Sequence, residues 1–356
     1  MPQPSVLILK FGAIGDVIMA IPAAHALHLQ GFRIDWICSP TVAPILALYP
    51  WINPILIDDR ALLKGSPLAK LKVIAKMWRT LAGRHYDLVA NLYYDPRYRI
   101  LTLPVRATRR LMLSTTDRRF QLLPGRHHTD EYARILLNLP DHVRPTQLAP
   151  IPAPNLPPSP HPRTPGHARV ILAPAGARNL LRDDLLRRWP PELYVELTRQ
   201  LLAQNIEVVL IGGPDDAWIT ESFASLQVTN LIGKLKLPET LALLDDSDVM
   251  VTHDTGPLHL AGITRVAIVT LFGPTDPHGR LPQRPGTLAL WGGEHFACRP
   301  CYDGRDFAPC PSNDCMRQIT PTAVTHQILQ LLQTQPNKPS LFSSVPSVIR
   351  FPPYAQ

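Results

Sequence analysis

A glycine-containing turn near the start of the chain carries an acidic side chain where chemistry could take place. The segment Lys10-Phe11-Gly12-Ala13-Ile14-Gly15-Asp16-Val17 follows an apolar run, and its glycines allow a tight turn from a strand into a helix. It lacks the full GxGxxG pattern, so it fits a dinucleotide fingerprint poorly. Asp16 falls at the predicted helix start, where a carboxylate can accept a proton from an attacking hydroxyl group. Helix capping explains an acid at this position equally well, so both interpretations stay open here.

A second turn of this kind is His253-Asp254-Thr255-Gly256-Pro257-Leu258-His259. It follows an apolar run and opens a helix, and the free N–H groups of a helix start favour a phosphate group. Thr255 and Gly256 would provide a donor and close backbone approach, and His259 lies one turn further along the helix. The alternative is a structural helix start without a ligand.

Two further loops have residue types that suit an anionic ligand. Arg187-Arg188-Trp189-Pro190 enters a predicted helix, and an arginine there can bind a diphosphate through two hydrogen bonds. Phe272-Gly273-Pro274-Thr275-Asp276-Pro277 is a polar loop stiffened by glycine and proline at a strand end. Each loop alone is a weak signal, whereas four such loops in this order indicate a binding site.

Four cysteines lie close together in the sequence. Their spacing is Cys298-x2-Cys301-x8-Cys310-x4-Cys315, and four thiols match the ligand count of a tetrahedral Zn or Fe site. The spacing is not that of a standard zinc finger, so a structural Zn or Fe site, free or redox-active thiols, and disulfides all stay open. The fifth cysteine, Cys38, lies in an apolar run and is expected to belong to the core.

Strands and helices must position these loops, and the sequence predicts that the two kinds of element alternate along the chain. Apolar runs expected to be strands alternate with segments of helical composition in both halves of the chain, which is the signature of a parallel sheet with helices on its faces. The expected strands are Val6–Lys10, Ile34–Cys38, Ile55–Asp58, Asp87–Leu92, Arg169–Ala173, Glu207–Ile211, Asp248–Thr252 and Val266–Phe272. The expected helices are Asp16–Gln30, Val42–Tyr49, Pro67–Gly83, Pro191–Ala203, Trp218–Ser225, Pro238–Leu244, Gly256–Gly262 and Thr320–Gln333, with Pro22 expected to kink or restart the first of them.

The chain length of 356 residues suits two domains. Ten prolines between Pro140 and Pro165 predict a stiff, extended linker. We therefore predict two doubly wound α/β domains facing each other across a cleft: an acceptor-binding domain at 1–150, a linker at 151–166, and a nucleotide-sugar-binding domain at 167–333 that contains the cysteine segment 298–315. Residues 334–356 are rich in proline and serine and are expected to be disordered.

The net charge of +8 favours an anionic partner. Between Arg60 and Arg134 there are 16 lysines and arginines against 5 aspartates and glutamates. This stretch suits a solvated surface, a phosphorylated or carboxylated substrate, or an anionic membrane face, and no motif typical of nucleic-acid binding accompanies it. Neither a signal peptide nor an apolar run long enough to span a membrane is visible, so we expect a cytoplasmic protein with peripheral contact to the inner membrane.

Taken together, these motifs resemble glycosyltransferase family 9, the ADP-heptose:lipopolysaccharide heptosyltransferases. The resemblance extends from Val6 to about Gln333. The segments that carry it are Gly15-Asp16-Val17 with Pro22, Arg187-Arg188-Trp189-Pro190, Ile211-Gly212-Gly213, Leu231-Ile232-Gly233-Lys234, Asp254-Thr255-Gly256 with His259, and Phe272-Gly273-Pro274-Thr275. The loop before Arg187 is longer than is usual in the family, so Arg188 is a second candidate for the same role.

The resemblance implies a GT-B type fold of two Rossmann-like domains, inversion at the anomeric carbon, and catalysis without a metal or other cofactor. It implies that Asp16 is the general base and that Arg187, or Arg188, holds the diphosphate. Leu235 would contact the adenine and Asp215 the ribose. The donor-phosphate loop would comprise Asp254, Thr255, Gly256 and His259.

The predicted function is transfer of a heptose from an ADP-sugar donor to a hydroxyl group of an anionic glycan or glycolipid, with the lipopolysaccharide inner core as the expected acceptor. Three alternatives stay open. The acceptor could be another polysaccharide or a protein, or the chain could be an epimerase-like enzyme acting on sugar nucleotides. A non-catalytic protein that binds nucleic acid or lipid through its basic half would leave Asp16 and the Asp254–His259 loop without a role.

Overall fold

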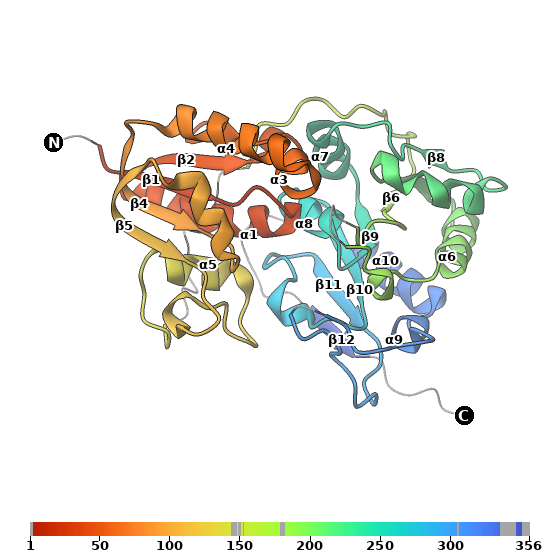
Figure 1. Cartoon of the computed structure of the whole chain (residues 1–356). Coiled ribbons are helices and arrows are strands. Elements are labelled where there is room, and N and C mark those ends of the chain that lie inside the picture. The colour runs from red at the N-terminus through yellow and green to blue at the C-terminus, as the bar shows by residue number, and fades with distance from the viewer. Residues whose placement is uncertain are drawn as a thin grey trace. The chain divides into compact units, whose positions relative to one another are not determined.

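The computed structural model describes residues 3–143, 148, 151, 153–178, 182–304, 306–334 and 347–350. The chain divides into two compact units, Met1–Pro154 and Asn155–Gln356, and each is built around its own sheet (Figure 1). Among the described residues, no helix has the length and apolar character needed to cross a membrane.

The first unit contains a five-stranded, fully parallel sheet in the order β3-β2-β1-β4-β5. All five residues of the central strand are buried, as expected for a strand covered on both faces. The strands are β1 (Ser5–Leu9), β2 (Arg33–Cys38), β3 (Ile52–Leu56), β4 (His85–Asn91) and β5 (Arg106–Met112).

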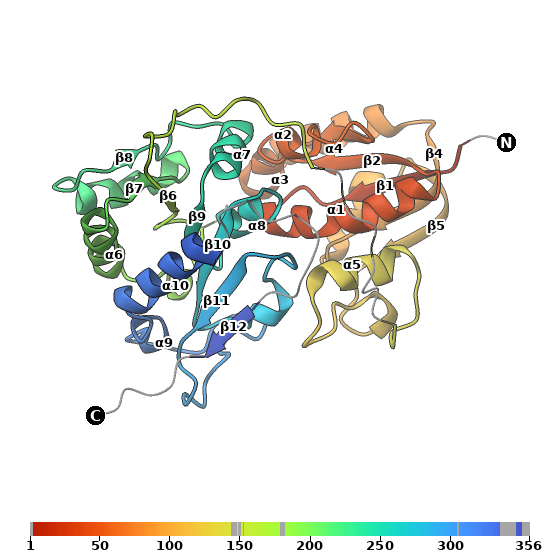
Figure 2. The same cartoon turned by 180° about the vertical axis from the view of Figure 1, so that it is seen from behind.

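Helices cover both faces of this sheet. Leu7 and Leu9 pack in one core cluster with Met77 and Leu81 of α4, which places α4 on that face. Helices α1 and α5 pack on one another on the other face, as Figures 1 and 2 show from opposite sides. The helices are α1 (Ile14–Leu29), α2 (Ala43–Leu46), α3 (Asp59–Lys64), α4 (Pro67–Leu81) and α5 (His128–Leu136), with the 3-10 helices η1 (Pro96–Thr102) and η2 (Arg118–Phe120).

The second unit contains a seven-stranded parallel sheet in the order β12-β11-β10-β9-β6-β7-β8. Three of its central strands, β6 (Arg169–Leu172), β9 (Val249–His253) and β10 (Ala267–Phe272), are short and buried along their whole length. The strands are β6 (Arg169–Leu172), β7 (Glu207–Leu210), β8 (Thr229–Asn230), β9 (Val249–His253), β10 (Ala267–Phe272), β11 (Thr287–Trp291) and β12 (Ser347–Arg350).

Two pairs of helices accompany this second sheet. Helices α6 and α10 pack together, and their apolar side chains share a core cluster with strand residues such as Val170, Val251 and Val269. Helices α7 and α8 also pack together, and α8 contacts β9 and β10. The helices are α6 (Pro191–Ala203), α7 (Leu237–Asp246), α8 (Gly256–Gly262), α9 (Asp314–Arg317) and α10 (Pro321–Thr334), with η3 (Leu185–Arg187), η4 (Pro214–Phe223) and η5 (Pro277–Gly279).

Several elements differ from those predicted from the sequence. Helix α1 continues through Pro22 without restarting. Residues 218–223 of the segment Trp218–Ser225 belong to a 3-10 helix rather than an α-helix. Strand β5 was missed because its sequence, Arg-Ala-Thr-Arg-Arg-Leu-Met, is mostly polar and exposed, as is typical of an edge strand that must resist pairing with another chain.

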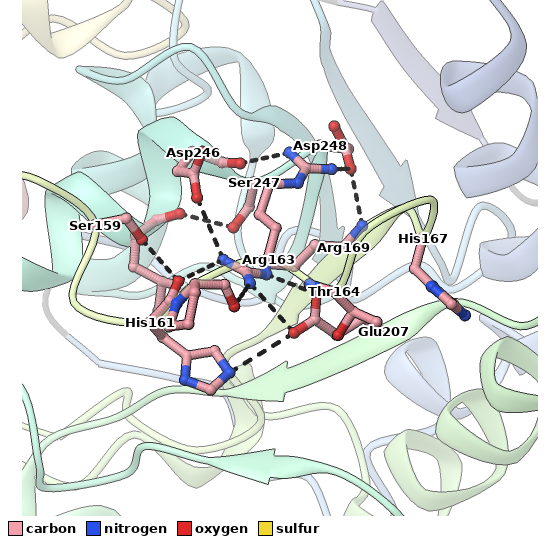
Figure 3. A network of polar contacts seen from close by, with 12 residues as sticks. Ser159, His161, Arg163, Thr164, His167, Arg169, Glu207, Asp246, Ser247 and Asp248 are labelled. Atoms are coloured by element: carbon pink, nitrogen blue, oxygen red, sulfur yellow. Dashed lines mark hydrogen bonds and ion pairs between the residues drawn. The ribbon is translucent and has the colours of Figure 1, made fainter.

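The end of the predicted linker is fastened to the second unit by a buried polar network (Figure 3). Arg169 at the start of β6 is fully buried and pairs with Glu207 at the start of β7, with Nε 3.0 Å from Oε2. Its guanidinium also donates to the carbonyl oxygens of His161 and Pro162, while Arg163 pairs with Asp248. Arg163 and Arg169 therefore attach the end of the predicted linker to the second unit, near the amino ends of its strands.

Within the tail predicted to be disordered, Ser347–Arg350 form strand β12 parallel to β11. The structure differs from the expectation of disorder at these four residues, whose sequence Ser-Val-Ile-Arg contains β-branched residues that suit a strand. Residues 335–346 and 351–356 of this tail lie outside the described residues.

Candidate active site

The turn after β9 brings together an acid and two arginines from separate loops. Asp254 is buried at the carboxyl end of β9. Its Oδ2 atom lies 3.5 Å from Nη1 of Arg187 and 3.2 Å from Nη1 of Arg280. The two guanidiniums come from the loop after β6 and the loop after β10, which reach the same edge because the carboxyl ends of parallel strands meet there.

Asp254 is ionised in this environment. Burial by itself would raise the pKa of Asp254, but the positive charges of Arg280, Arg187 and His259 more than offset that effect and lower it to about 2. His259 is also buried, one turn into α8, close enough to Asp254 to affect its pKa. The site thus contains a permanent carboxylate that holds cationic groups from neighbouring loops.

Thr255 joins this turn to the loop after β6. Its Oγ1 atom accepts a hydrogen bond from the backbone N–H of Ala177 at 2.8 Å, and no side-chain hydrogen bond from Thr255 caps helix α8. Gly176 allows this contact, since a Cβ atom added to it would lie 2.8 Å from Oγ1 of Thr255 and its φ of +90° favours glycine. Thr255 therefore fastens two loops together instead of serving as a simple helix cap.

The two adjacent arginines point to different partners. Arg187 faces Asp254, with its guanidinium also 3.5 Å from Asp184. Arg188 donates through Nε to the carbonyl oxygen of Gly176 at 2.8 Å, and its guanidinium lies 5.5 Å from the ring centre of Trp218. Arg188 therefore supports the loop after β6, and Arg187 is the arginine beside the acid.

The two residues expected to contact the nucleoside lie in neighbouring loops. Asp215 is exposed in the first turn of η4, and Leu235 is half-buried in the loop before α7. The adjacent Asp216 has a structural role, because its carboxylate accepts hydrogen bonds from the backbone N–H groups of Gly176 (3.0 Å) and Gly213 (2.8 Å). Of the two acids, Asp215 is thus the one that faces solvent.

The cysteine segment lies against the two arginines of the site. The backbone N–H groups of Cys301 and Tyr302 donate to the carbonyl oxygen of Pro274, at 3.0 and 3.2 Å, in the loop after β10. The ring centre of Tyr302 lies 5.0 Å from the Arg187 guanidinium carbon and 5.2 Å from that of Arg280. A segment noted in the sequence only for its thiols therefore supplies an aromatic wall to the site.

The four thiols of this segment do not meet as a metal-binding group. Within the described ranges, no set of three or more His, Cys, Asp or Glu side chains is arranged to hold a metal ion, so the geometry does not support the Zn or Fe site considered above. Cys298 and Cys310 are exposed, and none of the four forms a disulfide. Burial raises the pKa of the Cys315 thiol to about 12, which keeps it protonated at neutral pH.

In the first unit, Asp16 lies in the first turn of α1, whose N-cap residue is Ala13. Asp16 is therefore not the N-cap; its Oδ2 atom forms an ion pair of 2.9 Å with Nζ of the buried Lys10. Lys10 also donates to the carbonyl oxygen of Leu92 and lies over the ring of Tyr93. The side chain of Asp16 keeps 36% of its surface exposed, which leaves a carboxylate accessible at the turn.

Tyr93 supports this first turn and was not identified from the sequence. Its hydroxyl oxygen accepts hydrogen bonds from the backbone N–H groups of Phe11 (3.0 Å) and Gly12 (3.1 Å) and donates to the carbonyl oxygen of Gly12 (2.9 Å). Burial raises the pKa of Tyr93, so the hydroxyl remains a donor. Sequence reasoning likewise missed Arg280 and Tyr302. Arg280 lies three residues after the end of the recognised loop Phe272–Pro277, whereas no sequence signal singled out Tyr302.

Comparisons with known proteins find similar glycosyltransferases. Residues 174–308 match the family model described as glycosyltransferase family 9 (heptosyltransferase). The chain is 24% identical over 320 residues to lipopolysaccharide heptosyltransferase 3 of Escherichia coli, covering 82% of this chain and 90% of that protein.

Two solved structures share the fold. The E. coli heptosyltransferase WaaC with ADP aligns with a TM-score of 0.67 and 19% identity over 92% of this chain and 99% of that one. The iron-containing dodecameric glycosyltransferase TibC of E. coli H10407 aligns with a TM-score of 0.60 and 19% identity over 93% of this chain and 77% of that one. These likenesses confirm the predicted GT-B type fold with two parallel-sheet α/β domains.

Proposed function

With the chain placed in glycosyltransferase family 9, we propose that it transfers a heptose from ADP-heptose to a hydroxyl group of the lipopolysaccharide inner core. The observation that carries the proposal is the pairing of Arg187 with Asp254 at the carboxyl end of β9, beside Thr255 and Gly256. Relatives along most of the chain are lipopolysaccharide heptosyltransferases, and a structure of similar fold was solved with ADP, which supports both the acceptor and the donor.

In this proposal the second unit binds the donor. The buried Asp254 holds Arg187 with its charge directed toward the loop edge, where the diphosphate of the donor would be bound. Thr255 and Gly256 would approach the phosphates through the hydroxyl and the backbone, while Leu235 would contact the adenine and the exposed Asp215 the ribose. Fixed positive charge of this kind stabilises the negative charge that develops on a departing ADP.

Asp16 of the first unit is the proposed general base. The acceptor oxygen forms a bond to the anomeric carbon, its proton passes to the Asp16 carboxylate, and the bond to ADP breaks with its electron pair leaving on the diphosphate. The ion pair with Lys10 favours the charged form of the carboxylate. Asp16 is therefore a weak base, suited to accept a proton late, when the donor is already breaking and the hydroxyl has become acidic.

The first unit also offers a surface for an anionic, membrane-associated acceptor. Helix α4 exposes Leu68 and Leu71 together with the basic side chains of Lys72, Lys76 and Arg79. Apolar and basic side chains on one exposed helix suit contact with an anionic lipid surface. This surface supports peripheral contact with the cytoplasmic face of the inner membrane.

The proposed reaction uses no metal ion or other cofactor in any step. The positive charge beside the donor comes from side chains such as Arg187, which can take the part that a divalent cation plays elsewhere. TibC, of similar fold, contains iron. The four thiols of this chain do not fit a metal site in the described geometry, so no structural iron or zinc is included in the proposal.

Calorimetry tests the donor assignment. In metal-free buffer we expect ADP and ADP-heptose to bind, UDP and NAD to bind much more weakly, and Arg187→Ala to weaken ADP binding by about 10-fold or more, since a hydrogen bond to a charged group contributes about 1.5–3 kcal/mol. Arg199→Ala, an exposed arginine on α6, is the matched control. Equal binding of ADP and UDP would refute the assignment of ADP-heptose as the donor.

Product formation tests the general base. We expect Asp16→Asn to lower kcat by about 10²–10⁴-fold with lipopolysaccharide that lacks its heptose, while ADP binding stays unchanged. Asp59→Asn changes the same residue type in the first turn of α3 and should leave kcat unchanged. Near-full turnover by Asp16→Asn would exclude the role of Asp16 as base.

A further inference from the structure

Helix α4 of the first unit has two apolar stripes, and only one of them faces the core. Met77 and Leu81 are buried in the core cluster of this unit. The other stripe is exposed to solvent and contains Leu68, Leu71 and Trp78, which are three and seven residues apart and therefore lie along one side of the helix. Packing against the sheet requires one apolar stripe, so the exposed stripe has no role in the core.

The 3-10 helix η1 extends the exposed stripe. The indole Nε1 of Trp78 donates to the carbonyl oxygen of Ile100 at 2.6 Å, and α4 and η1 pack together. Ile100 and Leu103, the C-cap residue of η1, are exposed as well. Five of the ten exposed large apolar side chains in the described part of the chain thus lie on these two elements. We call Leu68, Leu71, Trp78, Ile100 and Leu103 the α4–η1 surface; such a gathering of apolar side chains is typical of an interaction site.

Basic side chains border this surface. Lys72, Lys76 and Arg79 are exposed on the neighbouring side of α4, four and three residues apart. Residues 60–84 contain seven lysines and arginines and no aspartate or glutamate. Among the described residues, none forms an ion pair with Lys72, Lys76 or Arg79. The border of the surface therefore carries positive charge that the first unit leaves uncompensated, which favours an anionic partner.

We propose that the α4–η1 surface binds an anionic phospholipid bilayer, with its apolar side chains between headgroups and acyl chains and with Lys72, Lys76 and Arg79 at the headgroups. A helix with apolar side chains on one side and basic side chains beside them lies in the plane of such an interface. Tryptophan suits this boundary, because its ring is apolar and its N–H group is polar. A second copy of the chain fits the surface less well, because pairing through the same face would bring two rows of like charge together.

The α4–η1 surface is connected to the turn that carries Asp16. The ring centre of Tyr98 in η1 lies 5.2 Å from that of Phe11 and 4.7 Å from that of Tyr93. The hydroxyl of Tyr93 in turn is hydrogen-bonded to the backbone of Phe11 and Gly12. Bilayer contact through η1 would therefore hold the proposed base at a fixed position relative to the membrane, where an acceptor anchored in lipid presents its sugar. This inference rests on the proposed function and deepens it, since turnover then depends on how the acceptor is presented.

Cosedimentation of the full chain with vesicles tests the charge requirement. We expect binding to vesicles that contain phosphatidylglycerol to be about 10-fold or more tighter than to vesicles of phosphatidylcholine alone, since each lysine or arginine near an anionic surface adds about 5-fold in affinity. Lys72→Gln/Lys76→Gln should weaken binding to the anionic vesicles by about 10–30-fold. The matched control, Arg199→Gln/Arg265→Gln, removes two exposed charges from the second unit and should stay within about 2-fold of the wild-type affinity.

Two further variants test the apolar part of the surface. Leu71→Ser should weaken binding to anionic vesicles by about 10-fold, because a leucine side chain no longer leaves water. Leu29→Ser changes an equally exposed leucine at the end of α1 (59% against 61% for Leu71) and should bind like the wild-type protein. Vesicles should shift the fluorescence emission to the blue in the wild-type protein and in Trp218→Phe, another exposed tryptophan, but not in Trp78→Phe.

Turnover tests the link to the reaction. With the acceptor embedded in vesicles that contain phosphatidylglycerol, Leu103→Ser should raise the KM for the acceptor by about 10-fold and leave kcat unchanged. With the deacylated, water-soluble form of the same acceptor, its KM should stay within about 2-fold of the wild-type value. Damage to the fold would instead affect both forms of the acceptor.

The outcomes separate this inference from the proposed function. If the wild-type protein does not glycosylate the deacylated acceptor, the proposed function is wrong, whereas vesicle binding with the expected losses would still support the surface. Normal turnover of that acceptor together with no binding to anionic vesicles, or with wild-type binding by Leu71→Ser, would overturn the inference. Equal binding to both kinds of vesicle would do the same. A dimer in sedimentation that Leu71→Ser converts to a monomer, without vesicle binding, would assign the surface to a second copy of the chain.

Discussion

His253, the last residue of β9, should make the second unit sensitive to mild acid. It is fully buried, and its Nδ1 atom lies 3.2 Å from the hydroxyl of Tyr194. Burial, with the nearby positive charges of Arg188 and Arg187, lowers the pKa of His253 from 6.5 to about 3. The folded unit therefore keeps His253 neutral at a pH where the unfolded chain already binds a proton.

The sign and size of the effect follow from this difference in proton binding. Above pH 6.5 both states are neutral at this residue and there is no penalty, whereas below pH 6.5 the unfolded state is favoured increasingly until the folded-state pKa near 3 is reached. At pH 5 the unfolded imidazole is 1.5 pH units below its pKa of 6.5, which corresponds to about 2 kcal/mol of lost stability. That loss is large for domains whose total stability is about 5–15 kcal/mol.

Urea unfolding of the full chain at several pH values measures this effect. We expect the free energy of unfolding of the second unit to fall by about 2 kcal/mol more between pH 7.5 and 5 in the wild-type protein than in His253→Asn, which keeps a polar partner for Tyr194. His295→Asn, at an exposed position, should follow the wild-type curve. Parallel pH curves for the wild-type protein and His253→Asn would show that His253 is not kept neutral by burial.

Three further predictions concern the packing of the second unit and the thiols. Gly176→Ala should weaken ADP binding by about 10-fold or more, because the new Cβ atom would lie 2.8 Å from Oγ1 of Thr255. The control is Gly166→Ala: Gly166 also has a positive φ, but no atom lies within 4 Å of the added Cβ, so only stability should change. Arg169→Ala should lower the free energy of unfolding by about 3–5 kcal/mol in urea, since it leaves Glu207 without its buried partner, whereas Arg199→Ala should change it by less than about 0.5 kcal/mol. A thiol reagent should modify the exposed Cys298 and Cys310 first, and much more slowly the half-buried Cys315 and the buried Cys38, whose pKa values are about 12; equal rates for these four thiols would contradict the burial described here.

The sequence by itself determined the architecture of alternating strands and helices. Buried parallel strands such as β1 and β10 are continuous apolar runs, and glycine-containing turns follow them, so these features can be recognised locally. The same local signals identified Asp16 and the Asp254–His259 loop. They could not identify β5, because an exposed edge strand carries no apolar period.

The tertiary structure alone decided which side chains meet. Sequence patterns left Arg188 as a second candidate beside Arg187, and the structure separates them: Arg187 faces Asp254 while Arg188 supports Gly176. Nothing local in the sequence connected Arg280 or Tyr302 with Asp254.

The physical reason is the order of the strands in the sheet. The order β11-β10-β9-β6-β7 brings the loops at the carboxyl ends of these strands to one edge, so residues more than a hundred positions apart in the sequence, such as Arg187 and Tyr302, come into contact. Periodicity reports which face of an element is buried, but it carries no information on which loops become neighbours. The turns of the site were therefore readable in the sequence, whereas its pair of arginines and its aromatic wall depended on the completed fold.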